Sequence, residues 1–334
     1  MGAQQLARLR KKQKWGWRQV CALLLSLIPL IGFILFSFAP LIISFVALFY
    51  NVNLNPPYDR VTGMQPDFTF TWNNFEGFKA VFMPGYIYNG AYEISKYFGQ
   101  SLLITLWIAA TQLVTLLIAL IISVLLASKP KGGKVFQILY FVPYICSSAA
   151  VAIMWRWIFS LDSAGILNTL LGTNRDWLRT TESSLTWAIV LATIWQAPGY
   201  GIVMYKAAIA NVSSSLYEAA SLDGANGFQK FRHVTLPGIA PTTFYLLLAG
   251  VGAGLLSYDI PSLMMGGGTG GWNGWNEDGS MGRTLMVLIR GMMDDTISEG
   301  LFVSAASVMS WFLFVITAAL SFVILRKRDK SMEG

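Results

Sequence analysis

The sequence predicts an all-α membrane protein with six transmembrane helices and both termini in the cytoplasm. Three observations lead to this fold class. Of the 334 residues, 54% are hydrophobic and only 12% are charged, about half the charged fraction of a soluble domain. The apolar residues gather in six long runs, and the basic residues gather on one side of those runs. Length alone would allow two soluble domains, but the composition overrides that expectation.

Each predicted span provides about 20 mostly apolar residues, enough to cross a hydrocarbon core of roughly 30 Å. The spans are residues 20–49, 101–127, 136–159, 185–210, 241–264 and 301–325. The first is longer than needed and contains Pro29 and Pro40, so we expect it to tilt or kink. It is also too long for a signal peptide, and we interpret it as a retained span behind a basic arm, residues 1–18.

The distribution of charge assigns the two sides of the membrane. With the N-terminus inside, the cytoplasmic segments hold sixteen of the 24 Lys and Arg residues but only four of the 17 Asp and Glu residues. Residues 51–100 then form a long extracellular segment, and residues 161–184 and 265–300 form two more. Because topology accounts for the net charge of +7, no nucleic-acid partner is expected; that would require a basic solvated face with stacking aromatics.

The cytoplasmic loop at residues 213–237 is the most informative segment. Residues 213–222 predict a short helix whose N-terminus is capped by one of the serines at 213–215. Gly224 is suited to end this helix in a left-handed conformation. A short amphipathic helix held at the membrane surface by two spans is well placed to dock into a groove of a partner protein.

The same loop carries a family signature. It reads Glu218-Ala219-Ala220, then Gly224 after three residues, then Val234-Thr235-Leu236-Pro237 after nine more. This pattern resembles the permease family of ATP-binding-cassette importers, and the flanking Asp223-Gly224-Ala225 resembles its carbohydrate-uptake branch, the maltose and multiple-sugar type. The resemblance extends over about residues 24–328, including Phe141-Val142-Pro143, and is weakest at 51–100. Gly266-Gly267-Gly268 stands where the family usually has Thr-Gly-Gly-Pro.

The resemblance implies a type I importer permease fold in a bacterial plasma membrane, with no catalytic residue and no cofactor in this chain. It implies a second homologous permease, two ATP-binding subunits that use MgATP, an extracellular solute-binding protein, membrane lipid and a carbohydrate substrate. The helix in the loop would contact the ATP-binding subunit and transmit its closure to the spans. The residues carried over to that contact are Glu218, Ala219, Ala220, Asp223 and Gly224.

Polar residues inside spans are costly and therefore mark candidate pathways. They interrupt span four at residues 195–201 and span five at residues 250–259. By resemblance to the maltose type, the candidates that line a sugar cavity are Gln196, Ala197, Tyr200, Gly250, Ala253, Gly254, Ser257 and Tyr258. For the glycines, close helix packing is an equally good interpretation. Aromatic rings and hydrogen-bonding groups suit the apolar faces and hydroxyl edges of a sugar.

Several alternatives stay open. An oligosaccharide is the first choice of solute, and a polyol or glycerol-3-phosphate is the second; the phosphate would require a cationic cavity. An ion-coupled secondary transporter would show inverted repeats and buried acids, for which only Asp259 qualifies. A membrane-bound enzyme would need convergent titratable groups. No metal site is expected at the single histidine, His233, and the stretch 266–274 lacks the Lys-Ser/Thr ending of a phosphate loop.

Overall fold

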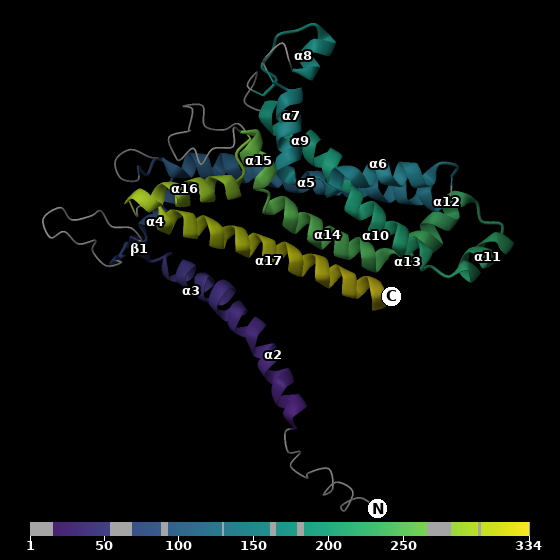
Figure 1. The fold of residues 1–334 in the computed structure, drawn as a ribbon, viewed down its shortest axis with the longest axis horizontal. Helices are drawn as coiled ribbons and strands as arrows, with labels where there is room; N and C mark the ends of the chain where they lie inside the picture. The colour runs from purple at the N-terminus through teal and green to yellow at the C-terminus, as the bar shows by residue number, and fades with distance from the viewer. Residues whose placement is uncertain are drawn as a thin grey trace, which may run out of the picture.

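The computed structural model describes residues 16–53, 69–87, 93–128, 130–160, 165–178, 184–265, 282–299 and 302–333. Over these ranges the chain is a bundle of long helices with one small sheet. The long helices that run side by side through the bundle in Figure 1 are α5 (Ile94–Ala127), α10 (Pro198–Ala210), α14 (Ala240–Leu255) and α17 (Val303–Glu333). Five helical segments are long and apolar enough to cross a membrane, or six if one bent pair counts as a span. The described part of the chain therefore agrees with a multi-pass membrane protein.

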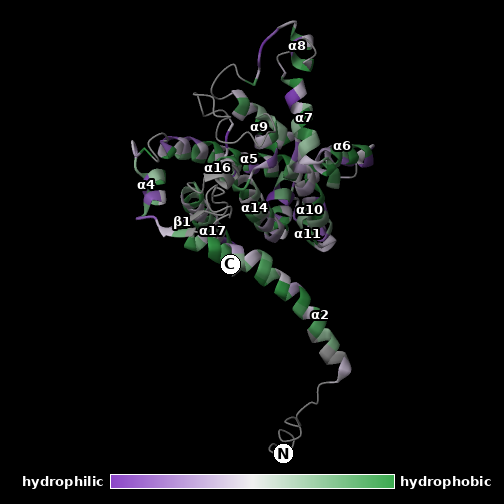
Figure 2. Cartoon of the chain, turned by 60° about the vertical axis from the view of Figure 1, so that its left-hand side comes forward, coloured by the Kyte–Doolittle hydropathy of each residue, from purple (hydrophilic) through white to green (hydrophobic). Residues whose placement is uncertain are grey.

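The first predicted span, residues 20–49, is one helical arm in three pieces. They are α2 (Trp17–Phe33), the π-helical turn η1 (Ile34–Phe38) and α3 (Ala39–Val46). Pro29 and Pro40 lie on either side of the π turn and lack backbone donors, so the expected irregularity falls between them. None of the apolar window within Leu24–Val46 is buried inside the chain. Figures 1 and 2 show this apolar arm leaving the bundle, so the rest of the described chain leaves most of its apolar surface uncovered.

The segment after α3 corrects two predictions. Strands β1 (Tyr50–Asn53) and β2 (Thr69–Trp72) pair antiparallel, with Tyr50 opposite Trp72, so the fold is not purely helical. Their Tyr, Val, Thr, Phe and Trp residues favour strands. A short helix, α4 (Glu76–Phe82), follows. Helix α5 then begins at Ile94 rather than at residue 101, so the last part of the predicted extracellular segment 51–100 is already helical.

Helix α5 packs closely against two other helices through small residues. A Cβ atom added to Gly201 of α10 would lie 2.8 Å from the Cβ of Ala119, and one added to Gly254 of α14 would lie 2.7 Å from a backbone carbon of α5. The Ser123 hydroxyl of α5 donates to the carbonyl oxygen of Ile202 in α10 at 3.0 Å. Close approach and side-chain hydrogen bonds hold helices together where lipid is as apolar as the side chains.

The third predicted span, residues 136–159, is wrong as a single helix. It is split into α6 (Gly133–Ile145) and α7 (Ser148–Ile158), which meet at an angle of 98°. Pro143 lacks an N–H donor in the last turn of α6. The Ser147 hydroxyl then accepts a hydrogen bond from the Ala150 amide at 3.3 Å and caps the start of α7. A hydropathy average does not detect such a corner.

Spans four and five are each interrupted, although their predicted bounds of 185–210 and 241–264 agree with the structure within one residue. Span four consists of α9 (Ser184–Gln196) and α10, joined at Ala197. Span five consists of α14 and α15 (Asp259–Met264), joined by residues 256–258. The polar interruptions seen in the sequence are therefore real breaks in the helices.

The last part of the chain closes the bundle. Helix α16 (Leu285–Glu299) packs on α17, which continues past the predicted end at residue 325. Just before α16, the Thr284 hydroxyl donates to the Ser257 carbonyl oxygen at 2.7 Å, and the buried Leu285 amide donates to the Thr105 hydroxyl of α5 at 2.7 Å. The expectations for the basic arm at residues 1–15 and for the glycines at 266–271 lie outside the described residues.

One buried amide organises a small lobe around α8 (Ile166–Leu171), within residues 165–178. Asn168 is 2% exposed, and its side-chain nitrogen donates to the carbonyl oxygens of Ser160 and Arg175, both at 2.9 Å. Its side-chain oxygen accepts from the Thr173 hydroxyl at 3.0 Å and from the Trp177 indole at 2.7 Å. This lobe projects from the top of the bundle in Figure 1, beyond α7.

Candidate functional site

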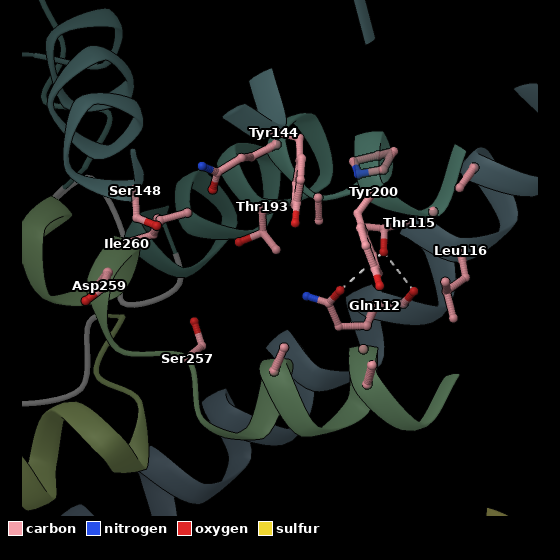
Figure 3. Close-up of a pocket in the computed structure, with 18 of the residues that line it drawn as sticks. Gln112, Thr115, Leu116, Tyr144, Ser148, Thr193, Tyr200, Ser257, Asp259 and Ile260 are labelled. Atoms are coloured by element: carbon pink, nitrogen blue, oxygen red, sulfur yellow. Dashed lines mark hydrogen bonds between the residues drawn. The ribbon is translucent and has the colours of Figure 1, made fainter. Parts of the chain in front are cut away.

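A cavity of about 880 Å³ lies where the helices of the bundle are interrupted. Its walls come from α5, from the corner between α6 and α7, from the joint of α9 and α10, and from the end of α14 with the start of α15. Figure 3 shows these elements surrounding an open space. Irregular backbone is tolerated at membrane depth where it lines a cavity. The three breaks thus create both the room and the polar surface of the site.

Hydroxyl and amide groups are fixed around the cavity by hydrogen bonds. The Gln196 amide nitrogen donates to the Cys146 carbonyl oxygen at 3.0 Å, which uses an acceptor left free by the end of α6. In α5, the Thr115 hydroxyl lies 2.8 Å from the Gln112 carbonyl oxygen and 3.3 Å from the Gln112 side-chain oxygen, as the dashed lines in Figure 3 mark. These groups present donors and acceptors to the cavity at fixed positions.

Three tyrosines from three helices meet at one side of the cavity. The rings of Tyr144 in α6 and Tyr200 in α10 are stacked, with centroids 5.7 Å apart and planes 28° apart. The Tyr200 hydroxyl lies 3.1 Å from the hydroxyl of Tyr245 in α14. This bond joins spans four and five on the side of the cavity nearer the loop between them. An aromatic face beside amides and hydroxyls is the surface that a sugar ring requires.

Asp259, at the start of α15, carries the one carboxyl group among the described residues that line the cavity, and none of these residues is a lysine, arginine or histidine. In Figure 3 it lies across the open space from Tyr200, near Ser148 and Ser257. The rest of the described lining consists of hydroxyl, amide, phenol, thiol and apolar groups. The cavity therefore has a slightly negative character at one end and is neutral elsewhere.

The structure brings most of the predicted solute-binding residues together. The cavity is lined by Gln196, Ala197, Tyr200, Gly250, Ala253, Ser257 and Tyr258. Gly254 is the exception, because an added Cβ would meet the backbone of Ala109 in α5 rather than open space. For this glycine, the packing interpretation agrees with the geometry. The binding role of the other seven stays a prediction.

Sequence reasoning missed the contribution of α5 and α6 to the cavity. Gln112 and Thr115 lie in a long apolar run that was interpreted only as a span, and Tyr144 lies in what was predicted to be a continuous helix. A signal was present, because Gln112 is the one amide within the predicted span 101–127. An amide inside a span requires a partner or a cavity.

The predicted coupling helix is present as α11 (Ser214–Leu222). Gly224 has the expected left-handed φ of +76°, and the amide of Ala225 donates back to the Ala220 carbonyl oxygen at 2.9 Å, which closes the helix end. Ser213 occupies the N-cap position, but its hydroxyl bonds to the Ser215 hydroxyl at 2.7 Å instead of a backbone amide. The prediction that a serine occupies the N-cap is therefore confirmed, but the prediction that its side chain caps a backbone amide is wrong.

Helix α11 is exposed along most of its surface. Glu218, Ala219 and Asp223 are exposed, and Leu222 is 90% exposed. Phe228, in the following short helix α12 (Gly227–Lys230), is 69% exposed. Large apolar side chains beside charged ones on an exposed loop are typical of a protein interaction surface. The contact of these residues with an ATP-binding subunit stays a prediction.

The loop and the cavity lie at opposite ends of the same two helices. Helix α10 begins beside the cavity at Pro198 and ends at Ala210, just before α11. The chain returns through η2 (Phe231–Thr235) and α13 (Leu236–Gly238) into α14, whose far end again lines the cavity. Two helices that line the cavity, α10 and α14, therefore connect it directly to the loop.

Interrupted spans around a polar cavity, joined to an exposed surface helix, define a membrane transport subunit. Comparison with known proteins gives the family. Residues 115–330, more than half of the chain, match the family described as "Binding-protein-dependent transport system inner membrane component". The chain belongs to this family, which confirms the resemblance carried by residues 218–237.

Similar proteins agree with this assignment. The chain is 30% identical over 304 residues to "Probable ABC transporter permease protein YesP" of Bacillus subtilis (strain 168), covering 89% of this chain and 86% of that protein. It is 29% identical over 187 residues to "Arabinooligosaccharides transport system permease protein AraP" of the same organism, covering 54% of this chain and 56% of that protein. Its fold is similar to a chain in the "Crystal structure of a bacterial ABC transporter involved in the import of the acidic polysaccharide alginate", with a TM-score of 0.71, 20% identity and coverage of 97% and 99%.

Proposed function

We propose that this chain is one of two related permease subunits in an ATP-driven, binding-protein-dependent importer of uncharged oligosaccharides. Family membership supports the transport role, and the relative named for arabinooligosaccharide transport supports the class of solute. The observation that carries the proposal is the position of the cavity and of α11 at opposite ends of α10 and α14. In this arrangement the chain supplies a path and a mechanical connection, while partner subunits hydrolyse MgATP.

The cavity favours an uncharged solute of more than one sugar unit. Its volume of about 880 Å³ lies in the upper part of the range for small-molecule sites, which favours an oligosaccharide over a polyol. The described lining offers no lysine, arginine or histidine to balance an anion, and the Asp259 carboxylate repels one. Glycerol-3-phosphate therefore fits the lining less well than a neutral sugar, whose hydroxyls can bond to Gln196 and Ser257.

In the proposed cycle, α11 contacts the ATP-binding subunit on the cytoplasmic side. Closure of the ATP-binding subunits on nucleotide moves α11 of both permeases together and turns the cavity outward. There it receives the solute from the extracellular binding protein. Hydrolysis then separates the ATP-binding subunits, and the cavity opens inward. The C-terminal end of α17 lies at the same end of the bundle as α11 in Figure 1, so the proposal assigns both to the cytoplasm.

The test is Glu218→Lys in the complete transporter, reconstituted in vesicles with its partner subunits and binding protein. Reversal of charge on the exposed face of α11 is expected to abolish binding-protein-stimulated ATP hydrolysis and solute uptake, while membrane insertion stays intact. The matched control is Glu76→Lys, which makes the same change in α4 at the opposite end of the bundle. An unchanged ATPase rate in Glu218→Lys would refute the coupling role, and uptake of a uronic oligosaccharide as fast as its neutral counterpart would refute the solute class.

A further inference from the structure

A second cavity, of about 540 Å³, lies behind the coupling helix. It is formed by the end of α5, the end of α10, one side chain from α11 and one from η2. Its lining residues are Val124, Leu126, Ala127, Lys206, Ile209, Ala210, Tyr217 and Thr235. The family match and the solute cavity do not account for this space, which shares α5 and α10 with the solute cavity but none of its described lining residues.

The lining has the composition of a ligand site. Most of it is aliphatic, and three polar groups converge on it: the Lys206 ammonium, the Tyr217 phenol and the Thr235 hydroxyl. Mostly apolar walls with a few placed polar groups are typical of sites that bind small amphiphilic molecules. Among the described residues of this lining, Lys206 is the one charged side chain, and the partner that the structure gives it, the side-chain oxygen of Gln137 in α6, is an uncharged amide. The cavity can therefore accept an anionic group.

The position of the cavity indicates where such a molecule comes from. Spans two and four end at Ala127 and Ala210, so Lys206 lies about one helical turn from the end of its span, near the level of lipid headgroups. Val124 and Ile209 continue the apolar wall from the spans. Basic pockets between transmembrane helices on the cytoplasmic side are suited to lipid headgroups. A lipid would place its phosphate at Lys206 and its acyl chain along the aliphatic wall.

We propose that this cavity binds a phosphate-headed anionic lipid of the inner leaflet, which regulates the coupling helix. The cytoplasmic placement of the site, and its regulatory effect, rest on the proposed function. Tyr217 precedes Glu218 in α11, and its hydroxyl lies 2.9 Å from that of Thr235 in η2. A lipid seated between Tyr217 and the ends of α5 and α10 contacts both sides of the joint between the coupling helix and the bundle. Its presence stiffens this joint, so that ATP-driven displacement of α11 is passed on to α10.

The test uses the complete transporter in nanodiscs of phosphatidylcholine, titrated with dioctanoyl phosphatidylglycerol, with dioctanoyl phosphatidylcholine or with inorganic phosphate. Native mass spectrometry reports bound lipid, and binding-protein-stimulated ATP hydrolysis reports its effect. We expect phosphatidylglycerol to bind and to raise the stimulated rate. Lys206→Gln is expected to weaken its binding about fivefold, the contribution of one basic residue near a membrane surface. Ala127→Phe keeps the charge but puts an aromatic ring into the cavity, and it is expected to weaken binding.

The matched control is Lys131→Gln, which removes an exposed lysine from the short connection between α5 and α6 that does not line the cavity. Equal loss of lipid in Lys131→Gln and Lys206→Gln would overturn the proposal, because the lipid would then respond only to surface charge. Equal binding of phosphatidylcholine would overturn it as well. Displacement of the lipid by inorganic phosphate at similar concentrations would identify a soluble phosphate compound as the ligand and overturn the lipid assignment. Because lipid binding is measured without transport, its failure is distinguishable from a failure of the proposed function.

Discussion

Gly254→Ala separates helix packing from solute binding at a residue for which both interpretations were open. The added Cβ would lie 2.7 Å from the Cα of Ala109 and 3.0 Å from the Cγ of Gln112. Carbon atoms in contact prefer separations of about 3.5–4.0 Å. Because the nearest atom belongs to the backbone of α5, no side-chain rotation relieves the overlap. Helix α14 must therefore move away from α5 by roughly 1 Å, the difference between these two separations.

The magnitude follows from two opposing terms. Inserting a methyl group into a closely packed interface costs about 1–3 kcal/mol. Replacing glycine by alanine inside a helix recovers up to about 1 kcal/mol through helix propensity. The net expectation is a loss of about 1–2 kcal/mol in stability. The same shift displaces Gly250 and Ala253, which lie on the cavity wall of α14, so solute uptake should also fall.

Thermal unfolding of the purified protein in detergent measures the effect. The control is Gly252→Ala on the same helix, because an added Cβ there has no atom within 4 Å and gains the propensity term alone. We expect Gly254→Ala to melt a few degrees below the wild type and Gly252→Ala to melt at or slightly above it. Equal melting temperatures of the two variants would refute the packing argument. A stable Gly254→Ala protein that fails only in solute uptake would favour direct contact with the solute.

Two further substitutions test polar groups buried in the described fold. Asn168→Ala removes the side chain that bonds Ser160, Thr173, Arg175 and Trp177, and it is expected to lower the stability of the lobe by about 1–3 kcal/mol. Limited proteolysis should therefore cut the α8 lobe faster in this variant, whereas Leu170→Ala, at an exposed neighbour, should leave the cleavage rate unchanged. Equal cleavage rates in the two variants would contradict this account. Thr105→Val keeps the shape of the side chain but leaves the buried Leu285 amide without its acceptor, so a similar loss is expected. Chemical denaturation measures the second loss, and a variant as stable as the wild type would show that the bond is dispensable.

Hydropathy predicted the positions of the spans well, because an apolar run of about 20 residues has few alternatives to crossing the bilayer. It failed at the corner between α6 and α7, where Cys146 and Ser147 are as compatible with an apolar run as with a turn. It also failed at the start of α5, where Ile94–Gln100 is too polar for a span yet helical, and where Ile94 and Phe98 are buried in a cluster with side chains of α4, α16 and α17. The β1–β2 pair depends on contacts between residues distant in sequence, which a single-sequence pattern does not reveal.

Only some of the residues that line the cavity were predicted, because the others reach it through packing between helices. In span five, small and polar residues follow one another in the sequence, and this pattern predicted Gly250, Ala253 and Ser257 as lining residues of the cavity. Gln112 and Thr115 are separated by apolar neighbours and reach the cavity only because α5 lies between α10 and α14. The coupling loop was predicted most fully, since Gly224 and the helix before it depend on local sequence alone.

In the proposed cycle, the close contacts of α10 with α5 would make α10 a lever with an off-centre fulcrum. Gly201 against Ala119, and Ile202 bonded to Ser123, hold the helix near its cavity end. At 1.5 Å per residue, Pro198 lies about 5 Å from Gly201 and Ala210 lies about 14 Å from it on the other side. A push of about 3 Å at the loop would thus become about 1 Å in the opposite direction at the cavity. If the proposed function holds, this ratio would convert a long displacement at the loop into a shorter and stronger one at the cavity, where several weak hydrogen bonds to the solute must break together.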